Sequence, residues 1–246
     1  MPRRFNPDEP ELMDRPQADS EELERDLENL ISLNRWFGSH RLLRHFLRRW
    51  WRRDDSYRVL DLCTGAGDLP RIMVDFARAR GIQVRIIALD ANPATLEIAR
   101  SRSPGYDEIN FVEGNALTYG SPGEFDLVHS ALALHHFSEA DASRLLQRAA
   151  LLAKRWVLVS DLERSPVTTA AIWLLTEFIY RDRMTRHDAR VSAQRAFSFQ
   201  EFRALASDAG WLGFGRGRFL FSRQALWLER GAEAPEEDLQ AEPCMG

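Results

Sequence analysis

Short apolar runs alternate with segments of helical spacing from residue 57 to residue 160. Each run is rich in Val, Ile and Leu and ends near an acid or a glycine turn, which is typical of a buried parallel strand that delivers its carboxyl end to a ligand. Strands that alternate with helices predict a parallel sheet with helices on both faces. The expected strands are residues 57–62, 84–89, 111–116, 125–130 and 156–160, followed by an antiparallel hairpin at 215–229.

The stretch YRVLDLCTGAGDL, Tyr57 to Leu69, is the most informative part of this pattern. Gly65-Ala66-Gly67 predicts a tight turn in which backbone amides approach a bound molecule without interference from a Cβ atom. Pro70 falls in the first turn of the next helix, where a missing N–H costs nothing. The second strand ends in Asp90, roughly twenty residues past the last glycine, the usual distance for an acid that binds a ribose.

Two classes of cofactor could explain this sequence pattern. A dinucleotide fold uses a third glycine, which lets the helix and strand pack closely around a pyrophosphate, and here Pro70 stands at that position. Asp61 lies four residues before Gly65 and is unfavourable beside a doubly negative pyrophosphate. A carboxylate instead attracts a cationic ammonium or sulfonium group. These residues favour a sulfonium cofactor over a nicotinamide or flavin.

At these residues the chain resembles motif I of the class I S-adenosyl-L-methionine-dependent methyltransferases, and FDLVHSALALHHF at 125–137 resembles the family motif after the fourth strand. The resemblance covers most of Tyr57 to Glu229. It implies an α/β fold, a Rossmann-like doubly wound sheet of seven strands, mostly parallel with one antiparallel strand. It also implies bound S-adenosyl-L-methionine, which the reaction converts to S-adenosyl-L-homocysteine. The family's cofactor contacts correspond here to Asp61, Gly65, Ala66, Gly67, Asp90, Ala91, Asn115, Ala116 and Ser130.

Asn115 matches a family position that reads the adenine amino group, and a plain turn asparagine is the alternative. Methyl transfer to a phenol or carboxyl also needs a proton removed, commonly by histidine or a carboxylate. The candidate bases are His135 and His136 after the fourth strand and His187 beside Asp188. For the histidine pair, a packed or hydrogen-bonded structural role is the alternative. No metal-ligand spacing occurs, so we expect no metal.

The expected acceptor is a small molecule. The Asn-Pro-Pro-aromatic signature of base and amide N-methylation is absent after the fourth strand, where Ser130-Ala131-Leu132-Ala133 stands instead. The tract TRHDARVSAQRAF at 185–197 resembles one in bacterial methyltransferases encoded beside polyketide and isoprenoid-quinone pathways. We therefore expect methyl transfer to a hydroxyl or carbon nucleophile of an aromatic, polyketide-like or quinone-like molecule. The alternatives are an inactive cofactor-binding partner subunit and a nucleotide-cofactor oxidoreductase.

The chain divides into a core and flanking segments. Residues 1–19 predict a disordered arm, 20–55 an N-terminal helical lid, and 231–246 a disordered acidic tail. Residues 56–230 form the methyltransferase core, with a substrate-side insertion at 162–197. The insertion contains an apolar helix around Ile172–Tyr180 and then a polar loop. The helix fits either a homodimer contact or a roof over the substrate.

Composition and charge limit the expected binding partners and cellular location of the protein. A net charge of −4 argues against a general nucleic-acid binder. The two cysteines, Cys63 and Cys244, suggest no disulfide framework, so we expect a cytoplasmic protein. No run reaches the ~20 apolar residues of a membrane span. The arginine-rich segment 41–53 is either a solvated helix face or a peripheral contact with an anionic membrane or an acidic partner.

Overall fold

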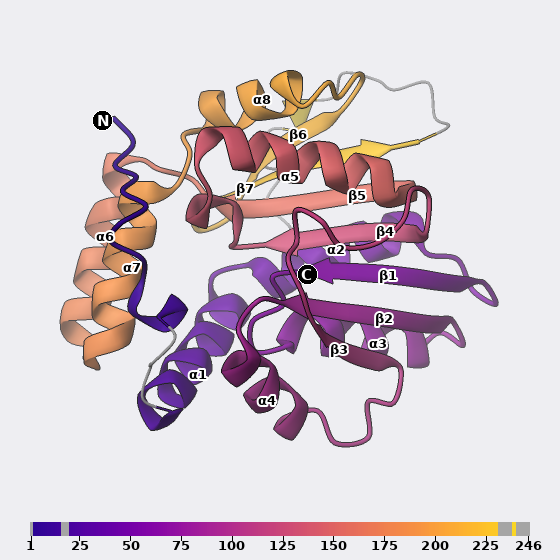
Figure 1. Ribbon diagram of the computed structural model, residues 1–246, viewed down its shortest axis with the longest axis horizontal. Helices are drawn as coiled ribbons and strands as arrows, with labels where there is room; N and C mark the ends of the chain where they lie inside the picture. Colours follow the sequence, from indigo (N-terminus) through magenta and orange to yellow (C-terminus); the bar gives the residue numbers. More distant parts are fainter. Residues whose placement is uncertain (1, 16–19, 231–237, 240–246) are drawn as a thin grey trace.

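The computed structural model describes residues 2–15, 20–230 and 238–239, and these form a mixed sheet flanked by helices (Figure 1). The strand order is β3-β2-β1-β4-β5-β7-β6-β8. The first five are mutually parallel, and β7 is antiparallel to both β5 and β6. The strands are β1 Ser56–Leu62, β2 Gln83–Asp90, β3 Ile109–Glu113, β4 Phe125–Ala131, β5 Ala153–Leu162, β6 Gly215–Phe219, β7 Arg223–Glu229 and β8 Asp238–Leu239.

The predicted doubly wound sheet with one antiparallel strand is confirmed, and one short strand is added to it. β8 pairs in parallel with β6 and comes from the segment that we predicted to be a disordered tail. For Asp238 and Leu239 that expectation is wrong. The remainder of 231–246 lies outside the described residues.

Helices cover both faces of the sheet because successive strand residues point to opposite sides. Val59 joins the core under α2, α3 and α4, whereas Leu60 joins the core under α5 and α8. Figure 1 shows α5 and α8 together on one side of the sheet. The bounds are α2 Ser39–Trp50, α3 Asp68–Arg78, α4 Pro93–Ser101, α5 Glu139–Leu152 and α8 Phe199–Asp208.

A further group of elements gathers beside the carboxyl ends of β1, β4 and β5 (Figure 1). Leu23 and Leu27 of α1 are fully buried in a small cluster with Ala66 of the glycine loop and Met184 of α7. α1 therefore lies over the loop that we predicted to bind the cofactor, while α2 packs on the sheet. These elements are η1 Leu12–Asp14, α1 Ser20–Trp36, η2 Leu134–His136, α6 Pro166–Phe178 and α7 Arg183–Arg195.

The N-terminal segment is ordered where we expected a disordered arm. Residues 2–15 lie along α7 and η2, and polar groups hold them there. Arg3 donates to the carbonyls of Arg195 at 2.6 Å and Phe137 at 2.7 Å, and the Leu12 amide donates to Asp188 at 2.8 Å. Composition missed this because most of these contacts are hydrogen bonds of polar residues, to which Leu12 and Met13 add partly buried apolar contacts. Residues 1 and 16–19 lie outside the described residues.

The insertion forms a helical hairpin of α6 and α7. The polar part, predicted as a loop, is the helix α7, which begins after Asp182, whose side chain accepts from the Thr185 amide at 2.9 Å. α6 exposes Trp173 and Phe178, and a homodimer contact there stays a prediction. Among the helices that the structure describes, none has the length and apolar character needed to cross a bilayer.

Candidate functional site

A cavity of about 750 Å³ lies at the carboxyl ends of the central strands. Its walls come from the glycine loop after β1, the turn after β2, η1, η2 and the inner faces of α1, α6 and α7. In open α/β sheets this edge is where ligands bind. The apolar wall is made by Leu27, Leu30, Leu33, Ala171, Ile172 and Leu175.

The glycine loop is shaped for close approach to a ligand. Gly65 has a φ of +55°, and a Cβ built on it would meet no atom within 4 Å, so its open side faces free space. Gly67 has a φ of +69°, and a Cβ there would lie 2.9 Å from Cε1 of Phe111. The missing side chain of Gly65 thus leaves space open at the cavity, whereas that of Gly67 lets the loop pack closely on Phe111 of β3.

Asp90 connects this loop to the turn after β2. Its Oδ2 accepts from the Gly65 amide at 2.9 Å and its Oδ1 accepts from the Asn92 amide at 3.0 Å. Burial raises the pKa of Asp90, and these two backbone hydrogen bonds oppose that rise. The carboxylate is therefore fixed in place while it lines the cavity.

Asp61 is held from two sides. The Thr64 hydroxyl donates to its Oδ2 at 2.5 Å, and the Nδ1 of His129 lies 2.5 Å from its Oδ1. Sequence reasoning missed His129, whose only signal was its place inside an apolar strand. Asp61 faces the cavity, and His129 lies behind it, fully buried.

The cavity lining separates the predicted cofactor residues into two groups. Asp61, Gly65, Ala66, Asp90 and Ala91 line it. Outside the lining are Gly67, Asn115, Ala116 and Ser130.

Asn115 and Ser130 have their own surroundings. The exposed Asn115 accepts from the Leu117 amide at 2.8 Å through its Oδ1, which matches the turn-asparagine alternative. The Ser130 hydroxyl is buried at the end of β4 and has no hydrogen-bond partner among the described residues. The structure therefore supplies a local role for Asn115 and none for the Ser130 hydroxyl.

Two of the three predicted histidines face the cavity. His135 Nδ1 lies 2.7 Å from Oδ1 of Asp161, and His136 Nδ1 lies 2.8 Å from Oδ2 of Asp14. Burial acts to raise the pKa of Asp161, but the charge and hydrogen bond of His135 lower it overall. The third, His187, is on α7 beside Asp188 at 2.8 Å, outside the cavity lining.

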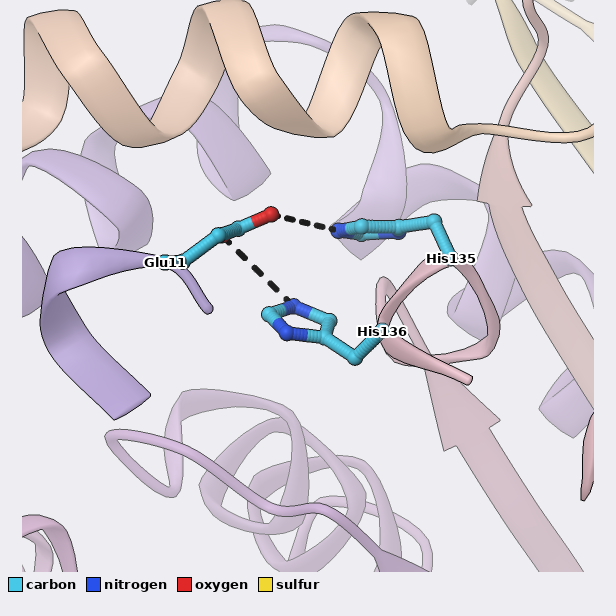
Figure 2. Close-up of side chains that lie close together, drawn as sticks. All are labelled: Glu11, His135 and His136. Atoms are coloured by element: carbon cyan, nitrogen blue, oxygen red, sulfur yellow. Dashed lines mark ion pairs between the residues drawn. The ribbon is translucent and has the colours of Figure 1, made fainter. Parts of the chain in front are cut away.

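Glu11 is a site residue that sequence reasoning missed. It is 2% exposed, and its carboxylate faces both histidines, as Figure 2 shows. Its oxygens are 3.9 Å from Nε2 of His135 and 3.7 Å from Nε2 of His136, and the Ser192 hydroxyl donates to Oε1 at 2.9 Å. Burial raises the pKa of Glu11, and the two histidines oppose that rise.

His136 is the most strongly shifted group of this cluster. Burial alone would lower its pKa, but the negative charges of Glu11 and Asp14 raise the pKa of His136 to about 10. From residue spacing we expected no metal site. The structure instead places a carboxylate and two imidazoles together, with their ligand atoms within 4.8 Å of one another.

Arg223 at the start of β7 also lines the cavity. No sequence pattern identified it as a site residue. Its Nε donates to the Phe37 carbonyl at 3.2 Å, while its buried Nη1 has no hydrogen-bond partner among the described residues. Burial lowers the pKa of Arg223 to about 10, and the charge of Asp161 opposes this. An unpaired guanidinium N–H in a cavity is suited to an anionic group of a ligand.

Acids dominate the charged lining. Such a lining attracts a sulfonium cation and disfavours a pyrophosphate. The residues therefore fit the sulfonium cofactor better than a dinucleotide. Among the described residues that line the cavity, one is an arginine, Arg223. The acidic ones are Glu11, Asp14, Asp26, Asp61, Asp68, Asp90 and Asp188.

Comparison with known proteins agrees with the sequence pattern. Residues 59–155 match the family model described as "Methyltransferase domain". The chain is 40% identical over 81 residues to the 2-phytyl-1,4-naphtoquinone methyltransferase of Thermosynechococcus vestitus, a match covering 33% of this chain and 35% of the relative. It is 37% identical over 84 residues to the demethylmenaquinone methyltransferase of Thermus thermophilus, covering 33% and 36% respectively. The chain thus spans little more than a third of the length of these curated relatives.

Solved structures share the fold over more of the chain. An O-methyltransferase family protein from Burkholderia thailandensis gives a TM-score of 0.66 at 19% identity, over 91% of this chain and 64% of that one. Human N-acetylserotonin methyltransferase, solved in complex with S-adenosylmethionine, gives a TM-score of 0.62 at 20% identity, over 87% and 57%. The chain therefore has the Rossmann-like fold of these structures, and its residues 59–155 match the methyltransferase family model.

Proposed function

We propose that the protein transfers a methyl group from S-adenosyl-L-methionine to a hydroxyl or carbon nucleophile of a small aromatic or quinone-like molecule. One observation carries this proposal. A single cavity joins the glycine loop with its acids, Asp61 and Asp90, to the histidine pair with its acids. A cofactor end and an acceptor end would therefore share one cavity.

At the cofactor end, the residues suit the parts of the donor molecule. The carboxylate of Asp90 sits where a ribose hydroxyl would donate to it, and Gly65 leaves its backbone open to the ligand. Asp61 places a negative charge near the glycine loop, which favours a sulfonium. The enzyme then needs chiefly to align a nucleophile behind the methyl group.

At the acceptor end, the apolar inner faces of α1 and α6 support an aromatic or quinone-like ring. Leu33, Ile172 and Leu175 line this part of the cavity, and apolar lining with a few placed polar groups is usual for small-molecule sites. The named activities of the two curated relatives, on a phytyl naphthoquinone and on a demethylmenaquinone, support the same acceptor class.

The histidine pair is the group that would handle the acceptor proton. Asp161 holds the Nδ1 of His135, so its Nε2 is directed into the cluster around Glu11. His187 lies outside the lining, so we assign proton handling to His135 and His136. The cytoplasmic location expected from cysteine usage stays a prediction.

Two other functions compete with this proposal. A nucleotide-cofactor oxidoreductase is disfavoured by Pro70 and by the acid-rich lining, and an inactive cofactor-binding subunit would retain the cofactor end alone. Calorimetric titration with S-adenosyl-L-methionine, S-adenosyl-L-homocysteine and NAD, on the native protein and Asp90→Ala, separates the cofactors. Binding of the sulfur nucleosides alone, weakened in the variant, is expected, and binding of NAD alone would overturn the proposal.

Turnover is tested next, by following methylated product from a series of hydroxylated naphthoquinones and phenols. We expect product from the native protein and a loss of at least tenfold for His135→Ala, since general acid–base groups contribute about 10²–10⁴-fold. Tight cofactor binding without product from any acceptor in the series would favour the inactive partner subunit.

A further inference from the structure

We propose that Glu11, His135 and His136 form a binding site for one divalent transition-metal ion, with Zn²⁺ as the first ion to test, at the acceptor end of the cavity. The existence of the site does not depend on the proposed methyl transfer. Its role, holding an oxygen atom of the acceptor, does rest on that function.

The three side chains supply the donor set that such ions use. One carboxylate and two imidazoles bind Zn²⁺, and two histidines with one carboxylate also serve Fe²⁺ sites. The donor atoms converge from two segments far apart in the sequence, η2 and the residue before η1, and lie within 4.8 Å of one another. Figure 2 shows both rings directed at the carboxylate.

The spacing of these atoms suits an ion better than direct hydrogen bonds. The Glu11 oxygens are 3.9 and 3.7 Å from the two Nε2 atoms, beyond hydrogen-bond length. Ligands at ~2.0–2.1 Å from a tetrahedral ion are about 3.3–3.5 Å apart. The two distances end on different oxygens of Glu11, and the whole donor set spans up to 4.8 Å. Binding of one ion would therefore draw the farthest pair together by as much as about 1.3–1.5 Å.

The surrounding groups orient the imidazoles as they do in metal sites. A histidine that binds a metal through one nitrogen almost always donates its other N–H to a carboxylate, a carbonyl or water. Here Asp161 takes the Nδ1 of His135 and Asp14 takes the Nδ1 of His136. Both Nε2 atoms are thereby the ring nitrogens directed at Glu11, and each binds an ion once its own proton has been released, as metal binding does. Ser192 fixes the Glu11 carboxylate.

The site has room for a further ligand. Glu11, His135 and His136 all line the cavity, so a fourth coordination position would face the space assigned to the acceptor. Metal sites with three protein ligands and an open position are typical of catalytic zinc. A hydroxyl or quinone oxygen of the acceptor would take that position, where the ion lowers the pKa of a bound hydroxyl. With the ion bound, both Nε2 atoms are ligands, so the histidines would act on the acceptor proton through the ion rather than as free bases.

The test measures metal binding directly. The full chain is stripped with a chelator, dialysed, and titrated calorimetrically with Zn²⁺ and, in parallel, by visible absorption with Co²⁺. We expect one ion per chain, and binding at least 100-fold weaker in Glu11→Gln and in His136→Ala. His187→Ala is the matched control, because it removes a histidine that is exposed and outside the cavity, and its affinity should equal that of the native protein.

Two results would overturn the site: no stoichiometric binding of either ion to the native protein, or equal affinity in Glu11→Gln and the native protein. Asp14→Asn, which keeps every ligand, should weaken binding about 10–100-fold, as loss of a carboxylate behind a ligand does. Thermal unfolding of each variant verifies that it is folded. S-adenosyl-L-methionine binding and product formation are measured separately, so failure of the metal site leaves the proposed methyl transfer standing, and the reverse also holds.

Discussion

Asp161 binds His135 twice: its Oδ1 lies 2.7 Å from the ring Nδ1, and its Oδ2 accepts from the His135 backbone amide at 2.9 Å. The carboxylate is fully buried at the end of β5, so the sheet itself fixes the ring of η2. A buried residue of the sheet thus fixes the orientation of the His135 ring.

Asp161→Asn should reduce turnover by at least tenfold while the protein stays folded. The amide is nearly the same size, but it can donate to Nδ1 and so favours the wrong tautomer of the ring. General acid–base groups contribute about 10²–10⁴-fold, which sets the scale of the loss. Steady-state rates with saturating cofactor measure it. Asp141→Asn, on the outer helix α5, is the control, and an equal rate for Asp161→Asn and the native protein would contradict the assignment.

Asp26 should make stability depend on pH. Burial raises its pKa to about 7, while the hydrogen bond from Thr185 lowers it and the acids Asp188, Asp182 and Glu11 raise it further. The unfolded value is about 3.9. The folded state therefore holds a proton that the unfolded state has lost, so this contribution to stability is complete below about pH 4 and declines as pH rises through 7.

Asp26→Asn removes that decline. The free energy of unfolding of the variant minus that of the native protein should increase by on the order of 1–3 kcal/mol when the pH is raised from 5 to 8. Denaturant titration at both pH values measures it. The Oδ1 acceptor for Thr185, now at 2.6 Å, is kept in the amide. The same substitution at the exposed Asp107 is the control. A difference in stability that is equal at both pH values would refute the shift.

Arg223→Met should stabilise the protein and weaken its ligand binding. Burial lowers the pKa of Arg223 to about 10, so the folded state disfavours the guanidinium charge at neutral pH. An apolar side chain of similar length removes that cost, and ~1 kcal/mol would raise Tm by about 2–4 °C in a chain of this size. The variant also loses the guanidinium of a residue that lines the cavity. Differential scanning calorimetry without and with S-adenosyl-L-methionine measures both effects, and a fall in Tm without ligand would contradict the prediction.

The two loop glycines should respond differently to alanine. At Gly67 a methyl group meets Phe111 at 2.9 Å in addition to the strain of φ +69°, so Gly67→Ala should cost about 1–3 kcal/mol of stability. At Gly65 the strain of φ +55° stands alone, but the methyl group enters the space left open to the ligand. Gly65→Ala should lose more cofactor affinity, and Gly67→Ala more stability. The reverse order in calorimetry and denaturant titration would refute this division.

The central sheet was predictable because its strands carry their own signal. Apolar runs such as Val84–Leu89 can be buried in few other ways, and the turn at Gly65 follows from backbone geometry. The end of the cavity that we assign to the cofactor is therefore lined by residues that the sequence pattern had singled out. Asn115 was assigned by its position in the family pattern, and the structure gives it a turn contact instead.

The acceptor end could not be predicted in the same way. Glu11 and Asp14 stand in a polar, proline-containing segment, where composition favours disorder, and only the folded chain brings them to His136. Arg223 and His129 gave no periodic signal because each is a single polar residue within or beside a strand. Contacts between polar residues distant in sequence carry no pattern that hydrophobic spacing could reveal.

The contacts made by residues 2–15 affect how the protein should be expressed. Met13 offers a second in-frame start, and a polypeptide initiated there would lack Glu11 and Arg3 while keeping every strand of the sheet. Such a product would still contain the glycine loop. Preparations that differ only in translation start or in the removal of an amino-terminal tag would then differ in chemistry, so the choice of start codon and tag position belongs to the design of every assay.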